Sequence, residues 1–106
     1  MNITVLTPDQ MIFEGAITSV KVPGTNGEFQ ILNSHAPIVS SLEEGLITIV
    51  ASDGTHQYYE ADSGDIVEEN ISGKVYTFTI EKGFIEVLKN NISLLVQGVG
   101  ANALQR

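Results

Sequence analysis

The chain has 106 residues, a length that suits one domain able to bury roughly two-thirds of its unfolded surface. It contains no cysteine, so the sequence offers neither a disulfide framework nor a thiolate metal site. Thirteen acidic and five basic residues give a formal net charge of -8. This charge argues against a nucleic-acid partner, because binding to phosphate backbones depends on lysine and arginine. The first residues alternate like a strand and show no basic region or long apolar run, so we expect neither a signal peptide nor a membrane span.

The first quarter of the chain predicts two strands and a loop. Residues 3–6 form a short alternating run that ends before Pro8, and a second run begins at Met11. Gly15 interrupts this run, and the β-branched residues at 16–22 change phase, which indicates a bulge or a strand covered on both faces. Residues 23–27 contain proline, glycine and asparagine and predict a loop.

The rest of the chain consists of short apolar runs separated by turn residues. We expect strands at residues 29–32, 38–42, 46–50, 56–61, 66–67, 75–80, 84–88 and 92–96. Asp53-Gly54 predicts a hairpin turn between two of these strands. Only residues 101–106 have a pattern that could form a helical fragment. The sequence therefore predicts an all-β domain over residues 1–98, a small β-sandwich or flattened barrel of about nine or ten short strands, followed by a short tail over 99–106.

One stretch, residues 27–39, departs from this generic pattern. A strand at 29–32 runs into the polar pair Asn33-Ser34, which favours a turn, and His35-Ala36-Pro37 follows. Because Pro37 biases Ala36 away from the α region, the backbone around His35 should be held without a helix. A rigid corner of this kind is typical of a docking edge.

This stretch, taken with residues 3–8 and 13–15 before it, resembles the epsilon subunit of F-type ATP synthases. Members of that family carry Gly-x-(aromatic or Leu)-Gly-Ile-Leu-Pro-Gly-His-Ala-Pro-Leu where this chain has residues 27–38. The chain departs from the pattern at three positions, which are Gln30, Asn33 and Ser34. Asn33 and Ser34 keep the capacity to form a turn. The end of the domain, residues 83–96, is also similar to the family.

The resemblance implies a non-catalytic subunit of the central stalk, in the rotor of a proton- or sodium-translocating ATP synthase, that couples the gamma subunit to the membrane c-ring during ATP synthesis. It implies a gamma interface at the family's His-Ala-Pro corner, here His35, Ala36, Pro37 and Ile38. It implies a c-ring contact at the loop that holds Gly27 and Glu28. No cofactor, metal or nucleotide is expected. The expected location is the cytoplasmic face of a bacterial inner membrane, where the chain is held peripherally through the complex.

Two departures from the family lie outside that stretch. Residues 56–74 form an extra excursion that we expect to be an acidic hairpin, with Glu60, Asp62, Asp65, Glu68 and Glu69. A calcium site is the alternative, but Asp62-Ser63-Gly64-Asp65 lacks the ligand spacing of a calcium loop. The chain also stops at Arg106, so by resemblance we expect it to lack the two C-terminal helices of typical members, together with their inhibition and nucleotide site.

Two other functions compete with the coupling role. A free-standing β-sandwich that binds a small ligand would need an aromatic-lined cleft, and the chain has no tryptophan and three tyrosines. An acidic enzyme domain could use His35 as a base, but adjacent residues in an extended segment point to opposite faces, so Ser34 and His35 are poor partners. No catalytic motif occurs in the sequence. We therefore expect a protein that is not an enzyme.

Overall fold

The computed structural model describes residues 1–60 and 63–100, so the possible helical fragment at 101–106 lies outside the described residues. The described residues form nine strands and no helix. The strands are β1 (Asn2–Leu6), β2 (Met11–Gly24), β3 (Gly27–Leu32), β4 (Ile38–Leu42), β5 (Gly45–Glu60), β6 (Asp65–Glu69), β7 (Val75–Ile80), β8 (Lys82–Leu88) and β9 (Asn91–Gln97). The predicted all-β class is confirmed. Among the described residues there is accordingly no helix long and apolar enough to cross a membrane.

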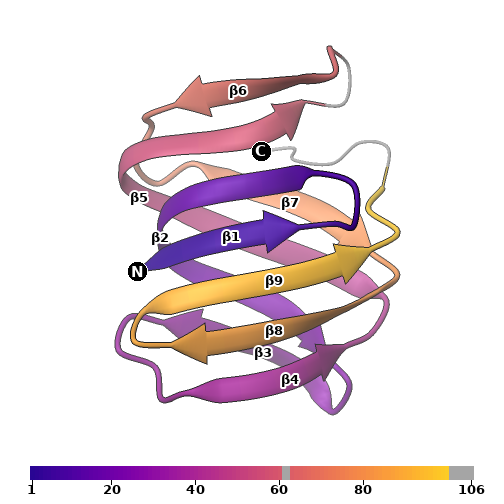
Figure 1. Cartoon of the computed structure of the whole chain (residues 1–106). Helices are drawn as coiled ribbons and strands as arrows, with labels where there is room; N and C mark the ends of the chain where they lie inside the picture. Colours follow the sequence, from indigo (N-terminus) through magenta and orange to yellow (C-terminus); the bar gives the residue numbers. More distant parts are fainter. Residues whose placement is uncertain (61–62, 101–106) are drawn as a thin grey trace.

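The strands make two layers, which Figure 1 shows one in front of the other. The front layer has the order β4, β8, β9, β1, the first half of β2, the second half of β5, and β6. The rear layer has the order β3, the second half of β2, the first half of β5, and β7. Because β2 and β5 run through both layers, the nine strands form one hydrogen-bonded sheet that is folded on itself. The predicted sandwich is thus confirmed, although these two strands have 14 and 16 residues and are not short.

The predicted hairpin at Asp53-Gly54 is wrong, because β5 continues through it. Gly15 of β2 pairs with His56 of β5, and Ile17 pairs with Ala51, so β5 has extra residues at this point. Asp53 and Gly54 therefore lie in a bulge where β5 changes layer, and Gly54 has a φ of 119°. The chain reverses later, between β5 and β6.

The predicted bulge in the second strand is confirmed by register shifts on both sides of Ile17. Gly15 does not end the strand. It lies against the buried ring of His56, where an added Cβ would be 2.8 Å from Cδ2 of that ring. Close approach of β2 and β5 explains why glycine occupies this position.

The core fills the space between the layers. Buried apolar residues come from all strands except β6, and Phe13, Tyr58 and Tyr76 form its aromatic part. The ring centroid of Tyr76 lies 4.9 Å from that of Phe13 and 5.3 Å from that of Tyr58, at tilted angles that aromatic pairs favour. The two layers are therefore joined by one continuous core.

The predicted acidic hairpin is present at the end of the front layer. Residues 56–60 of β5 pair with β6, from His56 opposite Glu69 to Glu60 opposite Asp65. Asp62 lies outside the described residues. Within residues 1–60 and 63–100, no group of three histidine or acidic side chains could hold a metal ion.

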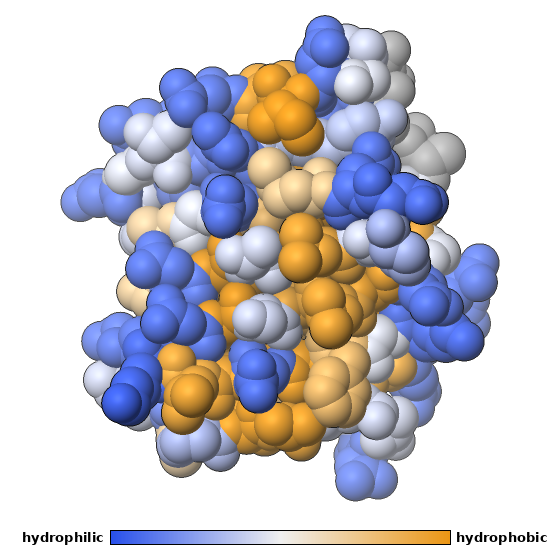
Figure 2. Space-filling view, in the orientation of Figure 1, coloured by the Kyte–Doolittle hydropathy of each residue, from blue (hydrophilic) through white to orange (hydrophobic). Residues whose placement is uncertain are grey.

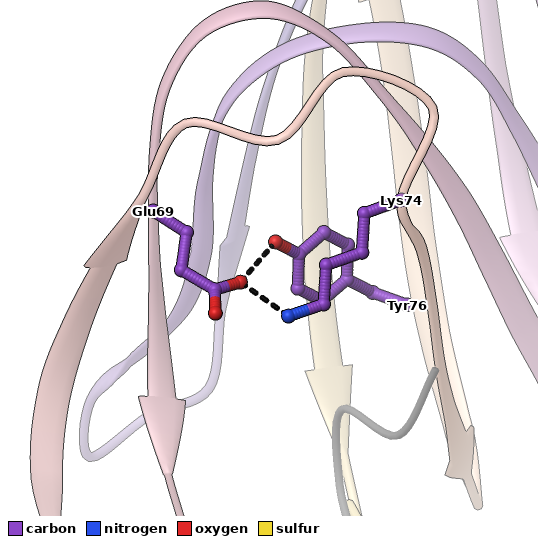
Figure 3. A network of polar contacts seen from close by, with 3 residues as sticks. All are labelled: Glu69, Lys74 and Tyr76. Carbon is purple, nitrogen blue, oxygen red and sulfur yellow. Dashed lines mark hydrogen bonds and ion pairs between the residues drawn. The ribbon is translucent and has the colours of Figure 1, made fainter.

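A polar network ties this hairpin to β7 (Figure 3). Glu69 Oε1 accepts hydrogen bonds from Lys74 Nζ at 2.5 Å and from the Tyr76 hydroxyl at 2.7 Å. Lys74 Nζ also lies 5.2 Å from the centroid of the Tyr76 ring. Burial, the largest single influence, raises the pKa of Glu69. The hydrogen bonds from Lys74, Tyr76 and Tyr58 and the charge of Lys74 outweigh it together and hold that pKa below the ordinary value of 4.5.

Neighbouring leucines on β9 test the sandwich. Leu94 is fully buried, whereas Leu95 is 51% exposed on the outer face of the front layer. We expect Leu94→Ala to lower the free energy of unfolding by about 2–5 kcal/mol, because it leaves a cavity in the core. Leu95→Ala should change it by about 0.5 kcal/mol or less. Urea unfolding of the two variants measures both values, and equal losses would contradict the two-layer arrangement.

The Glu69 network predicts a pH dependence. Since folding lowers the pKa of Glu69, its contribution to stability is complete above pH 4.5 and is lost as the pH falls through the folded-state pKa. We expect Glu69→Gln to cost about 1 kcal/mol in unfolding free energy at neutral pH and progressively less in acid. Urea titrations of the variant and the unaltered chain at neutral and acidic pH measure this difference. Glu68→Gln makes the same substitution at an exposed neighbour outside the Glu69 network and is the control for the loss of one charge.

Candidate protein-binding face

The outer face of the front layer carries large apolar side chains. On β8 and β9, Ile85, Val87, Ile92, Leu94 and Val96 point into the core, and the alternate positions point outward. From β4 to β1, the outward apolar residues on this face are Leu6 (37% exposed), Val39 (59%), Phe84 (42%), Leu88 (51%) and Leu95 (51%). Figure 2 shows this apolar surface in the lower half of the view, with hydrophilic side chains on both flanks. A contiguous apolar patch with a polar rim is typical of a protein-binding surface.

Strand register places three of these side chains in one row. Leu95 lies opposite Leu6 on β1 and opposite Phe84 on β8. Directly opposed residues have Cβ atoms about 5 Å apart, so the row is continuous across three strands. We call Leu6, Leu95 and Phe84 the apolar row.

The apolar row forms part of the wall of a groove of ≈ 620 Å³. Thr7 and Pro8, in the turn after β1, line one side, and Ser41 and Leu42 of β4 also line it. Lys82 is the charged residue among the lining. A groove with so few polar groups suits an apolar side chain of a partner better than a polar substrate.

The His35 corner, residues 33–37, connects β3 to β4. Asn33 and Ser34 form the turn expected from the sequence, and Ser34 has a φ of 66°. The Ser34 backbone N–H donates to Oδ1 of Asn90 in the β8–β9 turn at 2.7 Å, and the His35 N–H donates to the Leu32 carbonyl at 3.2 Å. The corner is therefore fastened to the front layer.

Side chains of the His35 corner lie at the surface. Ala36 and Pro37 are exposed, and His35 and Ile38 are half-buried. His35 Nδ1 lies 2.7 Å from the Ala36 carbonyl oxygen, to which a protonated Nδ1 donates. Pro37 and Ile38 also line a shallow groove of ≈ 290 Å³ with Glu86, Val87 and Leu88 of β8. The corner and the apolar face thus form one surface.

Gly27 and Glu28 lie elsewhere. Both are exposed where the β2–β3 turn enters β3, and Gly27 has a φ of 123°, which favours glycine. The six residues of β3 separate them from the His35 corner, a span of roughly 20 Å at the rise of an extended strand. The structure therefore places the two predicted contact sets at opposite ends of β3.

The second histidine belongs to the core. His56 is fully buried, its ring is stacked on Phe13 with centroids 6.1 Å apart, and Nε2 lies 2.8 Å from the Ala16 carbonyl oxygen. Nδ1 of His56 has no hydrogen-bond partner among the described residues. The ring fills space where β2 and β5 change layer.

Sequence analysis did not single out the apolar row. The signal was present, because Leu94-Leu95-Val96 is an uninterrupted apolar run and Phe84 has the opposite phase to Ile85 and Val87. Such patterns indicate a strand covered on both faces. The core covers one face of these strands, and the large apolar side chains on the other face are exposed.

Comparison with solved structures supports the fold. A chain of the Euglena gracilis mitochondrial ATP synthase, from a cryo-EM structure of OSCP, F1 and c-ring, matches with a TM-score of 0.67 and 17% identity over 92% of this chain and 51% of that one. A chain from the central stalk and c-ring of the Tetrahymena thermophila mitochondrial ATP synthase matches with a TM-score of 0.63 and 18% identity, over 94% of this chain and 65% of that chain. At these identities the likeness concerns the fold.

Sequence comparison gives closer relatives. An ATP synthase epsilon chain of Campylobacter lari is 42% identical over 64 residues, which are 60% of this chain and 49% of the relative. This chain thus spans about half the length of the Campylobacter relatives that it matches. An ATP synthase epsilon chain of Chlorobium limicola is 32% identical over 98 residues, which are 92% of this chain and 90% of the relative.

The family match covers most of the chain. Residues 1–68 match the family described as ATP synthase, Delta/Epsilon chain, beta-sandwich domain. The match runs from β1 into the acidic hairpin and includes the His35 corner and the β2–β3 turn. The chain therefore belongs to the delta/epsilon-chain family of ATP synthases, through the β-sandwich domain of that family.

Proposed function

We propose that this chain is a non-catalytic rotor subunit of a proton- or sodium-translocating F-type ATP synthase, coupling the gamma subunit to the c-ring. Family membership supports the complex, and the apolar face of the front layer is the observation that carries the coupling role. A part that transmits torque must be stiff and must bind both neighbours. The continuous core between the layers gives little conformational freedom, because such interiors are close-packed.

In this proposal the gamma subunit covers the front layer. The groove at the apolar row would receive apolar side chains of gamma, and His35, Ala36, Pro37 and Ile38 would form the edge of the same interface. The hydrogen bond from Ser34 to Asn90 supports this role, because it fixes the corner beside the front layer. Fixed contact groups lose less entropy on binding than mobile ones do.

The c-ring contact is proposed at Gly27 and Glu28. Their separation from the His35 corner by the length of β3 supports two different neighbours, since one surface can then be held by gamma while the other faces the ring. The exposed Glu28 carboxylate suits basic groups on the polar loops of the c-ring. The complex would hold the chain peripherally at the cytoplasmic face of a bacterial inner membrane.

A small-ligand module is the less favoured function. The groove at the apolar row contains one aromatic side chain, Phe84, and is lined by few polar groups that could orient a ligand.

The gamma interface is tested by placing a charge in the apolar row. We expect Phe84→Asp to weaken binding of the gamma subunit from the same organism by tenfold or more, because a buried carboxylate without a partner is costly. Binding of the purified subunits can be measured by calorimetry. His35→Ala should weaken gamma binding several-fold, because the proposal places His35 at the edge of the interface.

Leu46→Asp is the matched control, because Leu46 is 46% exposed on the rear layer and Phe84 is 42% exposed on the front. Circular dichroism and urea unfolding verify that both variants fold. The proposal is wrong if the unaltered chain has no affinity for gamma, or if the two aspartate variants bind gamma equally well.

Charge reversal at Glu28 tests the c-ring contact. We expect Glu28→Lys to weaken association of the gamma-bound chain with the detergent-solubilised c-ring by about fivefold, which corresponds to about 1 kcal/mol for an exposed ion pair. Affinity for gamma should not change. Asp53→Lys makes the same charge change in the β5 bulge and should bind the ring normally. If the Glu28→Lys variant binds the c-ring normally, Glu28 is not part of that interface.

A further inference from the structure

The acidic hairpin enlarges the outer face of the front layer. The second half of β5 and all of β6 lie beyond β2 in the front layer (Figure 1). By strand alternation, their outward side chains continue the face that begins at β4. Tyr59 lines a second groove, of ≈ 650 Å³, that shares Thr7 and Pro8 with the groove at the apolar row. The hairpin and the apolar row therefore border one continuous surface.

A row of polar side chains crosses this enlarged face. Thr4 of β1 lies opposite Glu14 of β2, Glu14 lies opposite Gln57 of β5, and Gln57 lies opposite Glu68 of β6. Thr4 Oγ1 donates to Glu14 Oε2 at 3.5 Å, and Gln57 Nε2 donates to Glu68 Oε2 at 3.3 Å. We call these four residues the acidic row. Both carboxylates are exposed.

The acidic row is not neutralised by the described part of the chain. Among residues 1–60 and 63–100 there is one salt bridge, which joins Lys74 to Glu69 on the inner side of the hairpin. Lys21 lies in the part of β2 that belongs to the rear layer, and Lys82 and Lys89 lie at the two ends of β8. The carboxylates of Glu14 and Glu68 are therefore uncompensated beside an apolar groove. Glu86 of β8 is exposed on the same face, and it lies opposite Ser93, which in turn lies opposite Thr4.

The spacing of the two carboxylates suits a protein partner. Glu14 and Glu68 are two strands apart, which corresponds to about 10 Å in a sheet. Residues i and i+7 of a helix are separated by nearly the same distance, about 10.5 Å. A helix lying across the strands can therefore present one basic side chain to each carboxylate.

We infer that the acidic row is an extension of the gamma-binding face, and that it pairs with basic side chains of the gamma subunit while apolar side chains of gamma occupy the adjoining groove. This inference rests on the proposed function. The hairpin supplies Gln57 and Glu68, so it adds a charged contact to the apolar one. The network at Glu69 fixes the hairpin from its inner side and presents the row ready for binding.

The double variant Glu14→Lys/Glu68→Lys tests the inference. We expect it to weaken gamma binding tenfold or more at about 50 mM salt and to reduce the decrease in affinity between about 50 and about 300 mM salt, because screening acts on exposed ion pairs. The control is Glu44→Lys/Asp53→Lys, which changes the net charge equally at two exposed positions outside the row. The control should bind gamma within about twofold of the unaltered chain. Urea unfolding checks that both variants fold.

Three outcomes would overturn the inference. If Glu14→Lys/Glu68→Lys binds gamma normally while Phe84→Asp does not, the proposed function stands and the acidic row is not part of the interface. If both double variants lose the same affinity, overall charge and not the row is responsible. If the unaltered chain does not bind gamma, the proposed function fails with the inference.

Discussion

The change of layer by β2 and β5 is the constraint on which the rest of the structure depends. Each strand contributes one half to the front layer and the other half to the rear layer, so neither layer can form without the other. Bulges at Gly15 to Ser19 of β2 and opposite them in β5 allow the bend, and the buried His56 ring fills the space there. A single folded sheet with one close-packed core leaves the layers little freedom to move against each other, which is the property that the proposed rotor role would require.

Much of this fold could be predicted from sequence, because the alternation of apolar and polar residues along a strand indicates which face of the strand packs against the core. The strand over residues 75–80 and the strand ending at Leu42 were placed correctly in this way. Asp53-Gly54 misled the prediction, since the same dipeptide serves a tight turn or a bulge. Pairing with β2 on both sides of the dipeptide decides between them, and that pairing joins residues far apart in the sequence.

The candidate site was only partly predictable for a related reason. The turn at Asn33-Ser34 follows from local chemistry, but its anchor, Asn90, is 56 positions away from Ser34. Leu6, Phe84 and Leu95 belong to three strands, and their contact is a consequence of register. Each residue alone is an ordinary exposed apolar side chain, and such residues are common on protein surfaces. Only their alignment makes a patch.

The two faces of the acidic hairpin show how a strongly charged segment can be both stable and available for binding. On the inner side, Glu69 accepts hydrogen bonds from Lys74 and Tyr76, so a partly buried charge has its partners within the chain. Glu68 directly precedes Glu69 in β6, so its side chain points to the outer side, away from this network. Lys74 pairs with Glu69 on the inner side and therefore does not neutralise the Glu68 carboxylate on the outer side. The alternation of a single strand thus assigns one glutamate to the fold and leaves its neighbour exposed for the contact that we propose.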